Sequence, residues 1–188
     1  MSAPAKSIEE LRSVADDISR SLGDLSAEQL NWKPGEKRWS VAQCLDHLIT
    51  THQLYFPLFE KLSADEARPS FWEKASPLSG FFGRFLIRSL DPKNTKKMKT
   101  TAKAFPSSSA IDGDIVDRFC RHQTELIGHI RAIRSDLNPS NTIVTSPLLG
   151  FVTYTLEDAL IFLPMHCERH LGQAKEVGRA AGFPVTLR

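Results

Sequence analysis

Two histidines four residues apart form the most chemically informative pattern in the sequence. On a helix, His166 and His170 lie one turn apart and about 40° apart in azimuth, so two imidazoles could bind one metal ion. Held on a buried face without a cation, such rings would leave nitrogen lone pairs to be satisfied away from water. The spacing therefore favours a metal site over two separate core histidines.

The same segment differs from a familiar metallopeptidase pattern. In H-E-x-x-H, a glutamate directly follows the first histidine and acts as the general base. Here Cys167 takes that position, and Glu168 comes one residue later, pointing away from the metal face. We therefore predict no peptidase mechanism of this type and interpret Glu168 as a solvated or ion-paired side chain.

A complete site needs a further ligand from another helix. Three imidazoles with one open position are typical of metals that activate a bound water or substrate, whereas structural zinc sites usually have four protein ligands. His47 lies at the margin of an apolar helical stripe. The other three histidines, His52, His122 and His129, lie nearer the centres of their stripes. Periodicity alone does not choose among the four.

The apolar periodicity predicts four long amphipathic helices that position these residues. Capping boxes mark three of their starts, at Ser7 with Glu10, Ser40 with Gln43, and Thr155 with Asp158, and Ser26 with Gln29 precedes a short helical turn. The four expected spans are residues 7–22, about 40–62, 115–137, and 155 to a stop at Gly182 and Pro184. Pro57 is expected to kink or shorten the second helix, and Pro164 to kink the fourth or mark an irregular start. No alternating pattern predicts strands.

Residues 63–109 show no sustained period and are expected to form a long, partly helical insertion. Connections of this length are often functional, so the insertion could cover a site. Its basic concentration consists of Arg84, Arg88, Lys93, Lys96, Lys97, Lys99 and Lys103, with Phe81, Phe82 and Phe85 nearby. This segment is interpreted either as a solvated face or as a surface for an anionic partner.

Composition places further bounds on the protein. The 188 residues, 41% of them hydrophobic, suit a single helical domain over 1–188, and a net charge of +2 gives no strong field for polyanions. The charged N-terminus is unlike a signal peptide, and no apolar run reaches membrane-spanning length, so we expect a cytoplasmic protein. Three separated cysteines, Cys44, Cys120 and Cys167, indicate reduced thiols.

Two motifs resemble those of the DinB-like superfamily of metalloproteins. They are Trp39-Ser40 followed by Gln43 and Leu45-Asp46-His47-Leu48, and His166-x-x-x-His170-x-Gly172-Gln173. The resemblance implies an all-α, up-down-down-up four-helix bundle with the long insertion between helices two and three, often as a homodimer. It also implies the metal ligands His47, His166 and His170.

The resemblance implies an enzyme of small molecules without identifying its reaction. Similar proteins include metal-dependent hydrolases and transferases that use low-molecular-weight thiols, so a metal-activated water or thiol is the expected reacting group. No other catalytic residue is assigned. Three imidazoles suit zinc or nickel, and also iron. We expect no nucleic acid partner, because the chain has no recognised reader motif. The alternative is a non-enzymatic, metal-pinned binding module with residues 84–103 as its partner surface.

Overall fold

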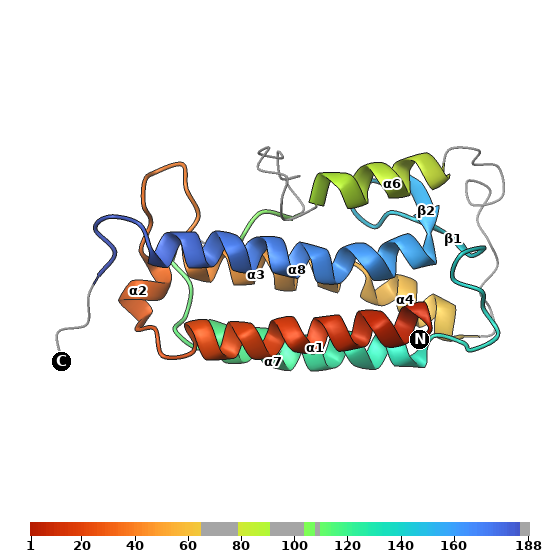
Figure 1. Cartoon of the computed structure of the whole chain (residues 1–188), viewed down its shortest axis with the longest axis horizontal. Helices are drawn as coiled ribbons and strands as arrows, with labels where there is room; N and C mark the ends of the chain where they lie inside the picture. Colours follow the sequence, from red (N-terminus) through yellow and green to blue (C-terminus); the bar gives the residue numbers. More distant parts are fainter. Residues whose placement is uncertain (65–78, 91–103, 108–109, 185–188) are drawn as a thin grey trace.

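Four long helices pack side by side in the computed structural model, which describes residues 1–64, 79–90, 104–107 and 110–184 (Figure 1). They are α1 (Ala3–Leu22), α3 (Val41–Gln53), α7 (Ile115–Ala132) and α8 (Leu156–Gly178). Each of α1 and α3 contacts both α7 and α8. The apolar stripes of all four helices meet in one core, as the periodicity predicts.

The direction of the helices confirms the up-down-down-up bundle. Helices α1 and α8 run one way along the long axis, and α3 and α7 run the other way (Figure 1). The two central helices in chain order are therefore parallel. A parallel pair requires the chain to return along the bundle between them, and the insertion makes this return.

Capping boxes start three helices at the predicted places. Ser26 and Gln29 cap the short α2 (Ala27–Asn31), and both reciprocal hydrogen bonds are also present before α3 and α8. The predicted start of the first helix at Ser7 is wrong. Helix α1 begins at Ala3 with Pro4 in its first turn, where a missing N–H costs no helical bond, and Ser7 is buried inside it.

The predicted shortening of the second helix near Pro57 is confirmed, since α3 ends at Gln53 and α4 (Phe56–Ser63) starts with Pro57 in its first turn. Two other predicted helix ends are corrected. Helix α7 ends at Ala132 instead of residue 137, because the chain turns so that the Arg134 amide donates to the carbonyl of Leu62. Helix α8 ends at Gly178, and Pro164 lies inside it, not at an irregular start.

A two-stranded antiparallel sheet, absent from the sequence prediction, precedes α8. Strands β1 (Ile143–Thr145) and β2 (Thr153–Thr155) have three residues each, too few to give an alternating pattern. Helix α6 (Ser79–Leu90) confirms that the insertion is partly helical, and it packs over α8 and β2. Its Gly83 allows this approach, since a Cβ there would lie 2.0 Å from Oδ2 of Asp158.

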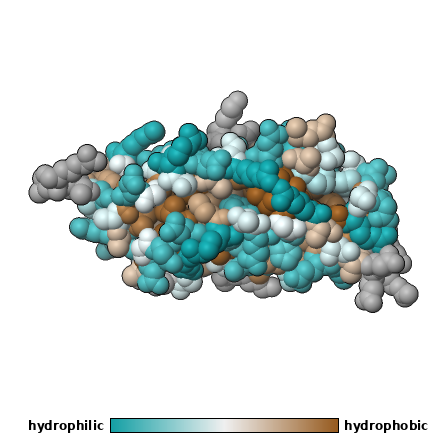
Figure 2. Space-filling view, turned by 90° about the horizontal axis from the view of Figure 1, so that it is seen from below, coloured by the Kyte–Doolittle hydropathy of each residue, from teal (hydrophilic) through white to brown (hydrophobic). Residues whose placement is uncertain are grey.

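The surface is mixed in character. Figure 2 shows a face largely covered by hydrophilic residues, with apolar residues visible in a band along the long axis. On α6, Arg84, Phe85 and Arg88 are exposed, whereas Phe82 packs partly buried against the core. The five lysines of the basic segment lie outside the described residues. Within the described part of the chain, no helix is both long and apolar enough to cross a membrane.

Candidate metal centre

The three predicted ligands converge at the packing of α3 against α8. The imidazole nitrogens of His47, His166 and His170 lie within 4.8 Å of one another. These residues are 5%, 7% and 8% exposed, so the cluster lies just beneath the surface. Among the described residues, this is the only group of three or more potential metal-ligating side chains.

The capping boxes of the two helices place this cluster. Ser40 and Gln43 fix the start of α3 so that His47 lies two turns into the helix. Thr155 and Asp158 fix the start of α8 in the same way, and its face then carries His166 and His170 toward α3. The site is thus built on two rigid helices whose first residues are locked.

A backbone contact fixes the tautomer of His47. Its Nδ1 donates a hydrogen bond to the carbonyl of Ala104, at the end of the insertion. The proton therefore lies on Nδ1, and the lone pair of Nε2 faces Nε2 of His166 at 3.2 Å. This is the arrangement of metal-ligating histidines, whose second nitrogen is usually held by a carbonyl or a carboxylate.

One edge of the cluster, whose ligand atoms all lie within 4.8 Å of one another, matches the spacing of two ligands on a divalent metal. Zinc–nitrogen bonds of about 2.0–2.1 Å at tetrahedral angles require ligand nitrogens about 3.3–3.4 Å apart. The 3.2 Å between the Nε2 atoms of His47 and His166 is close to this edge. The buried Nδ1 of His166 has no hydrogen-bond partner among the described residues, so this ring is not fixed through its second nitrogen as the ring of His47 is.

Burial keeps the three imidazoles in the neutral form that binds metals. It lowers the pKa of His47, although the Ala104 carbonyl and Asp46 partly oppose this. Burial and then the neighbouring histidines hold the pKa of His166 well below its usual value, and burial lowers the pKa of His170 to about 3. All three rings are therefore neutral near pH 7, the protonation state in which an imidazole nitrogen can bind a metal.

Trp39 covers one side of the cluster, a role that the sequence did not indicate. Its ring stacks on His170 with centroids 5.7 Å apart, and it also lies 4.9 Å from the ring of His47. In the sequence, Trp39 was notable only as part of the motif that includes Ser40 and Gln43. Its place directly before the Ser40 cap turns the ring back over the site.

The other three histidines lie outside the three-histidine group, although the ring of His52 lies 6.1 Å from that of His166. His52 is fully buried and stacks on His122 with centroids 5.8 Å apart. Phe56 stacks in turn on His122 and His129. Within the described residues, helix α7 therefore contributes no histidine to the three-histidine group.

The cysteines are free, and two of them are buried. Burial raises the pKa of both Cys44 and Cys167 to about 12, so neither is a thiolate at neutral pH. The Sγ of Cys167 accepts a hydrogen bond from Nε2 of Gln123 at 3.2 Å. These contacts support packing roles for both thiols.

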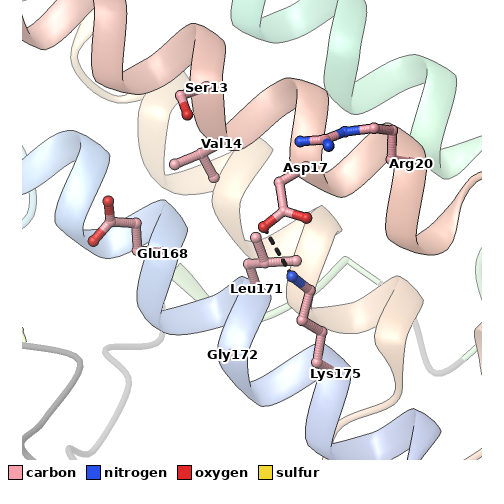
Figure 3. Close-up of a pocket in the computed structure, with 8 residues that line it drawn as sticks. All are labelled: Ser13, Val14, Asp17, Arg20, Glu168, Leu171, Gly172 and Lys175. Atoms are coloured by element: carbon pink, nitrogen blue, oxygen red, sulfur yellow. Dashed lines mark hydrogen bonds and ion pairs between the residues drawn. The ribbon is translucent and has the colours of Figure 1, made fainter.

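Glu168 faces away from the cluster, as predicted. It lines a surface groove between α1 and α8 with a volume of about 380 Å³, which the ion pair of Asp17 with Lys175 crosses (Figure 3). None of the three clustered histidines lines this groove. Burial raises the pKa of Glu168, with Glu10 adding to the effect, but the carboxylate lies on the wrong side of α8 to act at the site.

A buried carboxylate beside the cluster was missed by the sequence analysis. Asp46 is 3% exposed, and its Oδ2 accepts a hydrogen bond from the amide of Ser107 at 2.6 Å. Arg118 of α7 lies 3.9 Å from its Oδ1. The motif that contains Asp46 was visible in the sequence, but its partner is a backbone amide about 60 residues away, and no residue type marks such a partner.

These features define a four-helix-bundle protein with a buried cluster of three histidines. The chain belongs to the DinB superfamily, whose family model matches residues 10–174. It is similar in fold to YfiT from Bacillus subtilis, described as a probable metal-dependent hydrolase with an unusual four-helix bundle topology. The two are 19% identical with a TM-score of 0.57, and the match covers 96% of this chain and 89% of YfiT. No curated protein matches the chain.

Proposed function

We propose that this protein is a metal-dependent enzyme of small molecules, with His47, His166 and His170 as the ligands of one divalent transition metal. The observation that carries the proposal is the pair of Nε2 atoms facing each other at 3.2 Å while Nδ1 of His47 is held by the Ala104 carbonyl. With its proton on Nδ1, His47 presents a lone pair at Nε2, which can accept a hydrogen bond from a neutral His166 or can bind a cation. Burial disfavours the imidazolium form of both rings, so both stay neutral, and the presence of a third histidine nitrogen within 4.8 Å supports the metal.

The donor set points to Lewis-acid chemistry. When bound, zinc or nickel held by three neutral imidazoles would supply an electrophilic centre with an open position for water or a low-molecular-weight thiol. His47 is kept in the correct tautomer by Ala104, and Trp39 shields the cluster from bulk water. The reaction class is therefore hydrolysis or thiol transfer. The description of YfiT as a probable metal-dependent hydrolase supports the hydrolysis part of this proposal.

Three further expectations, on domain number, assembly and location, belong to the same proposal. We propose that residues 1–188 form one domain, that it assembles as a homodimer, and that it acts in the cytoplasm on a small molecule. Light scattering would measure the mass in solution, and fractionation of cells would test the location.

Metal content is the direct test of the site. Tag-free protein is analysed by elemental mass spectrometry, before and after reconstitution with zinc or nickel, beside a variant carrying His47→Ala and His166→Ala. We expect about one metal per chain in the native protein and almost none in the variant. His122→Ala is the matched control, since it removes another buried histidine outside the cluster, and it should retain the metal.

Two results would reject the proposal. One is a native protein that takes up no metal after reconstitution, and the other is a double variant that retains it. If metal binding is as expected, the loaded protein is screened against ester, amide and thiol-transfer substrates. Activity that disappears in the double variant and survives in His122→Ala would support an enzymatic role over the binding-module alternative.

A further inference from the structure

One short segment of the insertion contacts α3 at two adjacent residues. The carbonyl of Ala104 accepts from Nδ1 of His47, and the amide of Ser107 donates to Oδ2 of Asp46 at 2.6 Å. Adjacent helical residues point about 100° apart, so the two contacts hold the segment from two directions. Residues 104–107, the clamped segment, therefore lie across α3 at the position of the proposed ligand.

The clamped segment is suited to transmitting a restraint from one contact to the other. Pro106 lies between them, and a proline fixes its own φ and restricts the residue before it to extended conformations. Ala104 itself is 3% exposed. A fixed amide at Ser107 therefore limits where the Ala104 carbonyl can lie.

Asp46 has few other reasons to be buried. A carboxylate that is 3% exposed is costly unless it is paired or hydrogen-bonded. Arg118 is 39% exposed and lies 3.9 Å from Oδ1, a weaker contact than the 2.6 Å bond to Ser107. The short bond to the clamped segment is thus the main interaction of this buried charge among the described residues.

The alternative partner of His47 would not fix its tautomer. The hydroxyl of Thr51 lies 3.5 Å from Nδ1 and can act as donor or acceptor. A carbonyl only accepts, so the Ala104 contact alone requires the proton on Nδ1 and leaves Nε2 for the metal. If the carbonyl moved away, the ring could rotate or exchange its tautomer.

We propose that Asp46 is a positioning residue that clamps residues 104–107 onto α3 and thereby orients His47 for metal binding. The inference rests on the proposed metal site and adds the element that sets its affinity. Its contact with the metal is indirect, through Ser107, Ala104 and His47 in turn. Partners of metal-ligating histidines typically change metal affinity about 10- to 100-fold when they are removed.

The test compares the zinc affinity of variants by competition with a chromophoric chelator, and records the absorption spectrum of their cobalt complexes. Asp46→Ala removes the acceptor and should weaken zinc binding by up to about 10- to 100-fold, the loss typical when the direct partner of a ligating histidine is removed, with an altered cobalt spectrum. Asp46→Asn retains an oxygen that can accept from Ser107 and should restore most of the affinity. Leu48→Ala is the control for general loosening, because it shortens a fully buried side chain of the same helix.

Ser107→Pro provides an independent variant if Asp46→Ala fails to fold. It removes the amide donor at an exposed residue, leaves Asp46 intact, and should weaken zinc binding as Asp46→Ala does. Agreement between these two variants, with native-like Asp46→Asn and Leu48→Ala proteins, would support the clamp.

Each other outcome contradicts the inference in a distinct way. Native affinity in Asp46→Ala or in Ser107→Pro would show that the clamp does not set the site. Equal losses in Asp46→Asn and Asp46→Ala would assign the effect to the negative charge, which also acts on His47 electrostatically. Equal losses in Leu48→Ala would assign it to general destabilisation. A native protein that binds neither zinc nor cobalt would instead overturn the metal site itself, and the inference with it.

Discussion

Lowering the pH should destabilise the metal-free protein strongly, because its buried histidines resist protonation. In an unfolded chain, histidine takes up a proton near pH 6.5. In the folded protein, burial lowers the pKa of His170 to about 3 and that of His122 to about 4. Between pH 6.5 and about 4 the unfolded state therefore binds more protons, so the free energy of unfolding falls as the pH falls.

The size of the effect follows from these pKa values. Each histidine lowers the free energy of unfolding by about 1.4 kcal/mol per pH unit below 6.5, which is about 2 kcal/mol at pH 5. His170 and His122 together therefore lower it by about 4 kcal/mol. Burial also lowers the pKa of His47, His52 and His166, which adds to the loss in the same direction. Against a typical total of about 5–15 kcal/mol, this brings the protein close to unfolding.

Urea unfolding followed by circular dichroism, in the presence of a chelator at pH 7, 6 and 5, measures this loss. His122→Phe is an informative variant, since its ring can keep the stacking on Phe56 while the titrating group is removed. Between pH 7 and pH 5, the free energy of unfolding of this variant should fall by about 2 kcal/mol less than that of the native protein. A native free energy of unfolding that stays constant from pH 7 to 5 would refute the reasoning, because the histidines would then be protonated equally in both states.

Three further predictions concern the elements around the site. Gly83→Ala should destabilise the protein by about 1–3 kcal/mol in urea unfolding, because a Cβ there would lie 2.0 Å from the Asp158 carboxylate; no loss would contradict the close packing of α6 on α8. Thr155→Ala removes the cap of Asp158 N at 3.0 Å and should cost about 1 kcal/mol. The double variant Gly83→Ala with Thr155→Ala should lose less free energy of unfolding than the two single variants added together, because both changes disturb Asp158. Strictly additive losses would argue against this shared contact. Tyr55→Phe removes the 2.6 Å bond between two buried hydroxyls, and because Ser146 still bonds the hydroxyl of Tyr154, the free energy of unfolding should fall by about 0.5–1.5 kcal/mol in urea unfolding; no loss would contradict the pairing.

Local signals predicted the parts of the fold that local interactions determine. The capping boxes at Ser40 and Thr155 gave the starts of α3 and α8, because each box is complete within four residues. The same pattern at Ser7 was misleading. There the helix had already begun at Ala3, where Pro4 is tolerated in the first turn, and Ser7 is buried within it.

Periodicity also predicted one helix that is too long, because apolar residues can keep the same spacing after the helix has ended. Leu137 fits the stripe of α7, but the helix ends at Ala132 and the chain then bonds to the carbonyl of Leu62. Such an ending depends on a neighbouring helix and is therefore a tertiary effect. The three-residue strands β1 and β2 were missed for a related reason, because their pairing lies between segments too short to show alternation.

Within the candidate site, spacing predicted the histidine pair and resemblance predicted the third residue, and the structure brings all three together. His166 and His170 share one helix, so their proximity follows from helical geometry. His47 lies at the edge of its stripe, whereas the fully buried His52 lies nearer the centre. An apolar stripe predicts which side of a helix faces the core. It does not predict which residues of two neighbouring helices lie at the same height and so come together. The Ala104 carbonyl could not be found from sequence at all, because every residue has one.

The topology explains why the insertion reaches the site. Helices α3 and α7 are parallel, so the chain that leaves α4 must come back along the bundle before α7 begins at Ile115. That return ends near the start of α3, where Ala104 meets His47 and Ser107 meets Asp46, and Arg118 in the first turn of α7 completes the contact. In an up-down-up-down bundle, a short loop would join the second and third helices at the opposite end, and no returning backbone would pass His47. The parallel pair and the orientation of His47 are thus two consequences of one connection.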